Sequence, residues 1–295
     1  MTCYKHMMLE KGRESAVAIL PFCIIAVSFG SILIRLSDAH PISIAFYRLL
    51  FSTIILLFFI PRYIDEIKEI SRKRWIILLS TGGFLAIHFA AWVSSLSYTS
   101  VASSVILVSA HPLIVAWISQ RYLKERTSKK AYLAILLALV GIIIMTGSNY
   151  QIGRTVLFGD LLAIIGMLGI AGYIVRGRQI RSDMSVIPYA FIVYLFTTIF
   201  LGIFSLGFPE TYRIYPTNEY FLFILMAIVP HTLGHTVYNW ALKYIKARII
   251  SVSLLGEPVG ATILAFLILN EIPPVLTVVG GVITLSAIYL CSRYK

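Results

Sequence analysis

Glu257 is the one acidic residue that lies deep inside a long apolar stretch of this sequence. It stands about eight residues after the start of the run 249–269, and Pro258 follows it. If this run is a membrane helix, a rise of about 1.5 Å per residue places the carboxyl near mid-depth, where an ionised group costs at least ~2.5 kcal/mol. Such a carboxyl binds an amino group, carries a proton, or forms a hydrogen bond that only stabilises packing.

His111 occupies the matching position in the first half of the chain. At a shift of 146 residues, His111-Pro112 aligns with Glu257-Pro258. Proline removes a helical hydrogen bond, so Pro112 and Pro258 are expected to kink their helices beside the two titratable groups. An unperturbed imidazole titrates near about pH 6.5, which makes the two groups candidates for a relay of protons or substrate. A hydrogen bond to one backbone carbonyl would explain His111 equally well.

Two stripes of polar and aromatic residues have helical spacing. His88 and Trp92 are four residues apart in the run 75–97 and therefore share one face of a helix. The run 220–242 carries the second stripe, which consists of His231, His235, Tyr238 and Asn239. Both stripes are typical of a cavity wall, although ordinary packing would also explain the tryptophan and the tyrosine. The histidines and the asparagine are expected in the interior, away from lipid.

Arg48 is the one basic residue inside an apolar run. It lies about six residues into the run 42–60, shallow enough for its side chain to extend toward water at the membrane surface. There it could attract a carboxylate or pair with helix ends.

Several glycines and two glutamates are expected to be structural. The Gly256 to Gly260 spacing predicts a close contact between helices, and so does the series Gly166, Gly169 and Gly172. Glu125 and Glu271 lie at equivalent helix ends, where they are expected to cap a helix or pair with loop charges.

The composition indicates a membrane protein. Of 295 residues, 59% are hydrophobic and only 13% are charged, against about 25% in a soluble domain. The net charge of +12 could suggest a nucleic-acid partner, but the basic residues lie in short gaps between apolar runs. A lipid bilayer is therefore the expected surrounding, and no nucleic acid is expected.

Ten apolar runs reach about 20 helical residues, the length that crosses a bilayer. The predicted spans are 16–35, 42–60, 75–97, 101–122, 131–148, 156–176, 188–207, 220–242, 249–269 and 274–292. A transmembrane β-barrel would show short alternating segments, which these runs lack. Of 25 basic residues, 21 fall on one side, as the positive-inside rule requires when both termini are cytoplasmic. The expected fold class is an all-α, multi-pass protein of the plasma membrane.

The two halves of the chain resemble each other. Residues 45–56 and 190–201 share seven identities in twelve positions. Four more residues recur 146 positions later: Leu96, Tyr98, Pro112 and Glu125. Because each half has five spans, the second half must insert in the opposite orientation, an arrangement that accompanies alternating access around a central cavity. The expected units are a cytoplasmic segment 1–15, a five-helix repeat 16–148, an outer linker 149–155 and a second five-helix repeat 156–295.

On these residues the sequence resembles the drug/metabolite transporter superfamily, in its ten-helix branch with two EamA-type repeats. The resemblance runs from about residue 16 to 292 and is carried by Pro41, Ala45-Phe46-Tyr47-Arg48, Pro112, Glu125, Gly159-Asp160, Tyr173, Gly256-Glu257-Pro258 and Glu271. It implies a cavity lined by helices one to four and six to nine, with the fifth and tenth outside. It also implies transport of small metabolites, often amino acids or toxic compounds and commonly outward. The chain departs from many relatives at Phe29-Gly30, where they have Trp-Gly.

The expected function is therefore secondary transport of a small metabolite, in the direction of export. The chain has no ATP-binding G-x-x-x-x-G-K-[ST] motif and no cofactor is expected, so a gradient would drive the solute. Proton coupling is a hypothesis that rests on the deep Glu and His alone. The cysteines Cys3, Cys23 and Cys291 form no CxxC pair, so no metal site is expected.

Two other classes of function stay open. One is a receptor or scaffold without net flux, and the other is an intramembrane enzyme, which no nucleophile or metal motif supports. Neither the identity of the solute nor the choice between monomer and homodimer follows from the sequence.

Overall fold

The structure is a computed structural model that describes residue 10, residues 12–146 and residues 154–294. All regular secondary structure in these ranges is helical. Most of the expected segments 1–15 and 149–155 lies outside the described residues.

Eight helices in the described ranges are long and apolar enough to cross a membrane. Five are single elements: α5 (Arg72–Ser95), α8 (Lys129–Thr146), α9 (Arg154–Arg181), α10 (Val186–Ser205) and α15 (Val275–Arg293). The other three are composite: α6 (Val101–Val108) with α7 (His111–Tyr122), α11 (Thr217–Met226) with a π-helical stretch (Ala227–His235) and α12 (Thr236–Ala241), and α13 (Ala247–Leu254) with α14 (Gly256–Leu269).

Two bent pairs of helices pass the same test only when each pair is taken together. The first joins Gly12–Ala18 to α2 (Leu20–Arg35) at an angle of 41°. The second joins α3 (Pro41–Leu57) to the segment Ile60–Lys68, which contains a 3-10 turn (Ile60–Tyr63) and α4 (Ile64–Lys68), at 65°. The described chain therefore has eight spans, or ten if each bent pair is one span.

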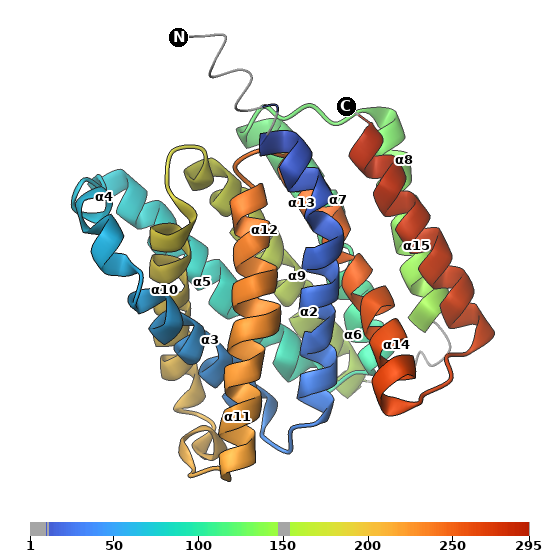
Figure 1. Cartoon of the computed structure of the whole chain (residues 1–295). Coiled ribbons are helices and arrows are strands. Elements are labelled where there is room, and N and C mark those ends of the chain that lie inside the picture. The colour runs from blue at the N-terminus through green and yellow to red at the C-terminus, as the bar shows by residue number, and fades with distance from the viewer. Residues whose placement is uncertain (1–9, 11, 147–153, 295) are drawn as a thin grey trace.

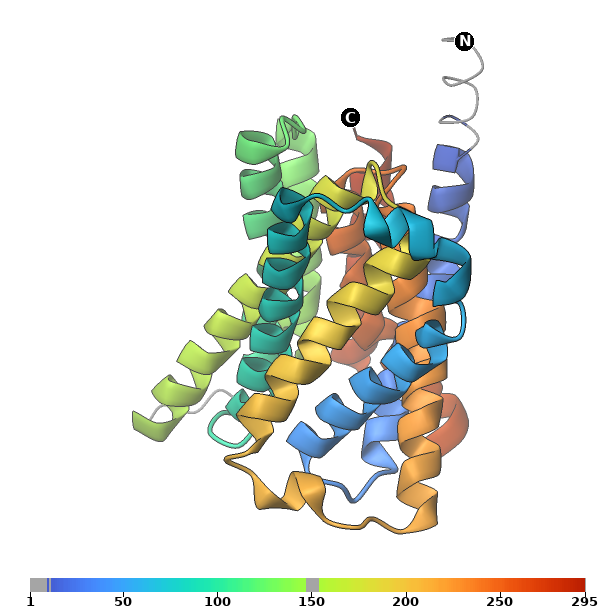
Figure 2. The same cartoon turned by 90° about the vertical axis from the view of Figure 1, so that its left-hand side faces the viewer.

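The spans form one bundle with two distinct ends (Figure 1). One end carries the start of the helix Gly12–Ala18 and the end of α15, and is called the terminal end below. The opposite end carries the loops 36–40, 206–216 and 270–274, and is called the far end. Figure 2 shows α3 and α10 crossing between the two ends on one side of the bundle. On the other side, α8 packs along α15.

Glycines set the closest contacts between helices, as expected from their spacing. A Cβ atom at Gly169 of α9 would lie 2.7 Å from the backbone nitrogen of His88 and 2.8 Å from the carbonyl oxygen of Phe84, so only glycine lets α5 approach this closely. At Gly256 of α14, a Cβ atom would lie 2.9 Å from the Ile24 side chain of α2. These glycines therefore allow α9 to pack closely on α5, and α14 to pack closely on α2.

Equivalent residues of the two halves touch each other at two places. Thr53 Oγ1 on α3 lies 3.4 Å from Thr198 Oγ1 on α10, and these residues are 145 positions apart. Thr284 Oγ1 on α15 donates to the Ala138 carbonyl on α8 at 3.5 Å, across 146 positions. Equivalent residues in contact must lie near an axis that relates the halves. The axis therefore passes between α3 and α10 and between α8 and α15.

The same backbone turn ends the fourth and ninth predicted spans. Lys124 and Asn270, which are 146 residues apart, both have φ of 56°, and they are the non-glycine residues with positive φ in the described chain. The next N–H group closes each turn at 3.2 Å, from Glu125 to the Ser119 carbonyl and from Glu271 to the Ala265 carbonyl. The sequence match between the halves is thus also a match in backbone conformation.

Candidate functional site

A cavity of about 190 Å³ lies in the centre of the bundle. Its walls come from α2, α3, α5, α6, α7, α9, the π-helical stretch, α13 and α14. The resemblance implied eight lining helices, and one of these, the seventh predicted span α10, contributes no residue to this wall. The lining residues run from the middle of the bundle toward the far end, for example from Val27 to Ile34 on α2 and from Leu85 to Trp92 on α5.

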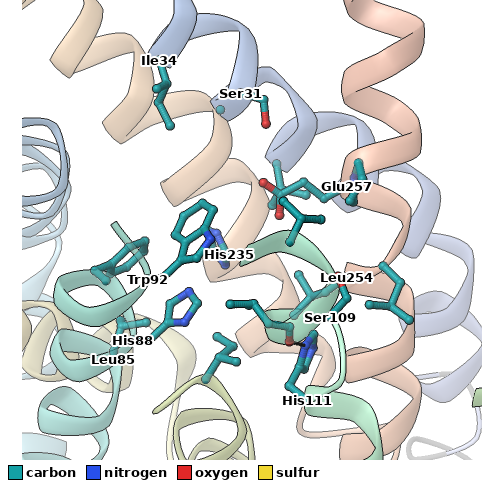
Figure 3. Close-up of a pocket in the computed structure, with 18 of the residues that line it drawn as sticks. Ser31, Ile34, Leu85, His88, Trp92, Ser109, His111, His235, Leu254 and Glu257 are labelled. Carbon is teal, nitrogen blue, oxygen red and sulfur yellow. Dashed lines mark hydrogen bonds between the residues drawn. The ribbon is translucent and has the colours of Figure 1, made fainter. Parts of the chain in front are cut away.

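Several side chains singled out in the sequence face this cavity together (Figure 3). They are Glu257, His111, His88, Trp92 and His235, with Arg48 and Pro258 also in the lining. Glu257 approaches from α14, while the two aromatic rings of α5 and the imidazole of the π-helical stretch approach from the opposite wall. The shared cavity brings together residues from both halves of the chain.

Breaks in two spans place His111 and Glu257 at the start of half-helices. α6 ends at Val108 and α7 begins at His111, with Pro112 in its first turn. α13 ends at Leu254 and α14 begins at Gly256, with Glu257 in its first turn. Each proline therefore lies beside the break in its span, next to the titratable side chain.

Arg48 is buried and does not extend to the membrane surface, so this expectation was wrong. Its side chain is only 6% exposed, with Nη2 3.2 Å from His231 Nδ1 and Cζ 4.8 Å from the centre of the Phe89 ring. Its Nε atom has no hydrogen-bond partner. The position of Arg48 in the sequence gave its depth, but the direction of its side chain depends on the π-helical stretch that packs on α3.

Hydrogen bonds determine which ring nitrogen of His88 and of His111 carries the proton and which one can accept a hydrogen bond. His88 Nδ1 lies 2.9 Å from the Gly166 carbonyl oxygen, and His111 Nδ1 lies 3.0 Å from the Val108 carbonyl oxygen. A carbonyl oxygen can only accept, so the proton of each neutral ring must be on Nδ1. Nε2 of each ring is then an acceptor, and that of His111 is buried without a partner. The ring of His88, which lines the cavity, can therefore receive a hydrogen bond from a bound molecule.

Arg48 and Glu257 present opposite charges to the same cavity without pairing with each other. Both line it, and no ion pair within 4.0 Å joins these two described residues. Trp92 stacks on His88 with ring centroids 5.7 Å apart and planes 7° apart, which adds a flat aromatic surface. The arrangement can hold a molecule that carries a carboxylate, an ammonium group and an apolar body.

Four of the predicted residues lie behind the wall. The cavity lining does not include His231, Tyr238, Asn239 or Pro112. The wide turns of the π-helical stretch, which contains Pro230, change the spacing between His231 and His235, and only His235 faces the cavity. Asn239 lies beyond this stretch, on α12, where its Nδ2 donates to the hydroxyls of Tyr173 at 2.7 Å and Tyr194 at 3.2 Å.

Asp160 is a buried acidic residue that the sequence reasoning placed at a span end. It is 8% exposed and accepts hydrogen bonds of 2.7 Å from Thr99 Oγ1 and Ser103 Oγ. It joins α9 to the start of α6 at the far end. Its position four residues inside the predicted span 156–176 was the available signal.

Known proteins resemble this chain along nearly its whole length. The model of the EamA-like transporter family matches residues 14–147 and again residues 157–293. An uncharacterized transporter of Archaeoglobus fulgidus is 27% identical over 281 residues, which cover 92% of this chain and 94% of the relative. The pseudopaline exporter CntI of Pseudomonas aeruginosa is 23% identical over 77% of this chain and 78% of its own length.

The fold also matches a solved crystal structure. The superposition has a TM-score of 0.79 at 15% sequence identity and covers 94% of this chain and 96% of the other. At this level of identity the likeness concerns the fold alone.

Proposed function

Because the chain belongs to the EamA-like transporter family, we propose that it exports an amino-acid-like zwitterion by alternating access. The family membership makes it a transporter and a multi-pass protein of the plasma membrane. The class of substrate, the direction and the mechanism are the parts that we propose.

The observation that carries the proposal is the unpaired charge of Arg48 and Glu257 at one cavity. Two opposite charges in a low-dielectric interior normally pair with each other, because an unpaired charge costs several kcal/mol. Both line the cavity and no ion pair joins them, so neither charge is neutralised by direct contact with the other. A zwitterion supplies both partners at once, a carboxylate for the guanidinium and an ammonium group for the carboxylate.

The remaining cavity groups support the same assignment. An ammonium group has three donors and needs acceptors, which Glu257 and Nε2 of His88 provide. The flat face of Trp92 and the aliphatic lining provide an apolar surface for a side chain of the substrate. The cavity volume of about 190 Å³ lies below the ~300–1,000 Å³ of sites for drug-sized ligands, in agreement with a small metabolite.

We also propose ten spans in two inverted five-helix repeats, 16–148 and 156–295, with both termini cytoplasmic. The bent pairs bring the number of spans to ten, and the loops of the terminal end carry most of the basic residues. The contacts between equivalent residues and the opposite directions of α3 and α10 support an inverted repeat. The terminal end is then the cytoplasmic end.

Export is supported by the name of one relative. The relative CntI is named an exporter of pseudopaline, which gives a direction but no substrate for this chain. A proton gradient is the proposed driving force, because Glu257 places a carboxyl group, which can bind and release a proton, at the cavity.

The test is uptake and efflux in proteoliposomes, with and without a pH gradient. The panel contains neutral amino acids, the matching amines without a carboxylate and the matching acids without an amine. The variants are Glu257→Gln and Arg48→Gln, with Asp183→Asn as control, since Asp183 forms an exposed ion pair with Arg74 outside the cavity.

We expect flux of a zwitterion that either cavity variant lowers at least about tenfold and the control leaves intact. A pH gradient should accelerate this flux in the wild type and not in Glu257→Gln. Equal flux of the amine and the zwitterion would contradict the role of Arg48. No flux for any compound, with the protein folded, would favour a receptor or another class of cargo.

A further inference from the structure

Two arginine–glutamate ion pairs lie at opposite ends of the bundle, with their glutamates 146 and their arginines 143 positions apart in the chain. Near the end of α9, Arg178 Nε lies 2.7 Å from Glu125 Oε1. At the end of α2, Arg35 Nη1 lies 2.7 Å from Glu271 Oε2. The two glutamates are 146 positions apart and each follows the residue with φ of 56°. Each pair therefore joins the end of a helix in one half of the chain to the turn after a helix in the other half.

The pair at the terminal end is embedded in backbone hydrogen bonds. Arg178 Nη1 also donates to the carbonyl oxygens of Leu242 and Lys243, and Glu125 Oε2 accepts the N–H of Ala247 at 3.0 Å. The two side chains are 22% and 12% exposed. The pair thus ties α9 and the turn after α7 to the turn between α12 and α13. It closes the terminal end below the cavity, where α7 packs directly on α13.

The pair at the far end is loose by comparison. Its side chains are 57% and 46% exposed, and neither the Arg35 nor the Glu271 side chain makes another hydrogen bond within the described chain. Both border a hollow of about 290 Å³ between α2, α14 and α15. This pair does not reach the turn between α5 and α6, which is the equivalent of the turn that Arg178 and Glu125 hold.

The turn between α5 and α6, which could bind the far pair, nevertheless has the same backbone hydrogen bonds as the turn between α12 and α13. In the turn between α5 and α6, the N–H groups of Ser97 and Tyr98 bond to the carbonyls three residues earlier. Lys243 and Tyr244, 146 residues later, make the same bonds in the turn between α12 and α13. At this shift the equivalents of Leu242, Lys243 and Ala247 are Leu96, Ser97 and Val101.

We propose that the two ion pairs are latches that the transport cycle engages in turn. This inference rests on the proposed alternating access. In the structure the terminal pair is bound to the neighbouring turn, whereas the far pair is formed as an ion pair but binds no turn, and the cavity extends toward the far end. In the opposite state, Glu271 accepts the N–H of Val101 and Arg35 donates to the carbonyls of Leu96 and Ser97. Arg178 and Glu125 are then the exposed pair.

The experiment measures from which side a cavity residue can be labelled. Ser109 lines the cavity and is replaced by cysteine in a chain whose native cysteines are alanine. A membrane-impermeant maleimide is added to right-side-out and to inside-out vesicles. Ser182→Cys, in an exposed position at the terminal end, reports in a separate sample which face that end occupies. The latch variants are Glu125→Gln and Glu271→Gln, and Asp183→Asn is again the matched control.

We expect Glu125→Gln to raise the ratio of terminal-side to far-side labelling about fivefold or more, because it weakens only the state with a closed terminal end. Glu271→Gln should lower the ratio or leave it at the wild-type level, and the control should not change it. If Glu125→Gln fails to fold, Arg178→Lys keeps the charge, loses the forked donors and should shift the ratio in the same direction.

Equal ratios in both latch variants and the control, or shifts of both latch variants in one direction, would overturn the proposal. Labelling needs no substrate, so its outcome is independent of the flux test. Absence of zwitterion flux together with opposite shifts would refute the proposed cargo and leave the latches standing.

Discussion

The terminal end and the far end of the bundle are built from matching segments, yet they are held together by different means. At the terminal end, three arginines donate to backbone carbonyls at the ends of helices: Arg178, Arg181 and Arg248. The last two are only 1% and 2% exposed. At the far end, the exposed pair of Arg35 and Glu271 stands beside a hollow.

The difference shows how a chain with two similar halves reaches an asymmetric shape. The last carbonyls of every helix lack partners within the helix, so an arginine that reaches them joins two segments strongly. The equivalent turns exist at the far end, but the arginine of the far pair, Arg35, does not bind their carbonyls. One end is closed and the cavity extends toward the other, although both ends use the same backbone turn.

The largest expected contrast between the ends comes from Arg178→Ala and Arg35→Ala. Loss of Arg178 removes an ion pair and two carbonyl contacts and leaves Glu125 mostly buried, so the free energy of unfolding should fall by about 3 kcal/mol. Loss of Arg35 should cost less than about 1 kcal/mol, because its pair is exposed. Denaturant unfolding of both variants in the same detergent measures the difference. Equal losses would mean that the two ends are held equally well.

Arg248→Met should give the next largest effect. Arg248 Nη1 donates to the Arg126 carbonyl at 2.6 Å and Nη2 to the Tyr294 carbonyl at 2.7 Å, and methionine keeps the volume but leaves both carbonyls without this donor. We expect a loss of about 2 kcal/mol in the same unfolding assay. Lys246→Met is the matched control, since Lys246 donates to the same Arg126 carbonyl from an exposed position at 3.3 Å and should cost less than about 0.5 kcal/mol. A control that loses as much as Arg248→Met would contradict this account.

Thr99→Val and Ser103→Ala test whether uncharged hydrogen bonds hold the far end instead. Each variant removes one donor to the buried carboxylate of Asp160 and should lower the melting temperature by an amount equivalent to about 1 kcal/mol. Ser97→Ala, in the same turn but without a side-chain bond to Asp160, is the comparison. The idea fails if the two donor variants have the same melting temperature as Ser97→Ala and the wild type.

Lys124→Gly and Asn270→Gly should have the smallest effects and compare the two equivalent turns directly. Both positions have φ of 56°, which glycine adopts without steric cost and which asparagine tolerates better than lysine. We expect Lys124→Gly to raise the free energy of unfolding by about 0.5 kcal/mol and Asn270→Gly to change it less. Lys124→Val should be destabilising, because a β-branched residue is strained there. A stabilising valine would show that the turn does not persist in the folded protein.

Much of the fold follows from the sequence because hydrophobic length and the repeat are local properties of the chain. The apolar runs gave helices at the predicted places, and the shift of 146 residues matched the left-handed residues Lys124 and Asn270. The glycine spacing on α9 predicted the close approach of α5, since a Cβ at Gly169 would meet backbone atoms. Ten spans and cytoplasmic termini remain predictions.

The candidate site could be predicted only in part. Glu257, His111, His88 and Trp92 were found from depth and spacing, and the structure places all four at one cavity. The stripe on the eighth predicted span brought only His235 to the cavity, because π-helical turns change the spacing from His231 and because Asn239 hydrogen-bonds to two tyrosine hydroxyls instead. Depth alone also misplaced the Arg48 side chain, which the structure directs inward against the His231 ring.

The sequence by itself determined the membrane-spanning character, the helical runs, the repeat and the breaks at His111-Pro112 and Glu257-Pro258. These properties depend on side-chain polarity, on spacing along a helix and on the missing N–H of proline, all of which are present in the chain before it folds. Only the tertiary structure decided that Arg48 and Glu257 face one cavity without pairing, and that one end of the bundle is closed. Both facts depend on contacts between residues far apart in the chain. Two similar halves could form such contacts at either end of the bundle, and in this structure they form them at the terminal end.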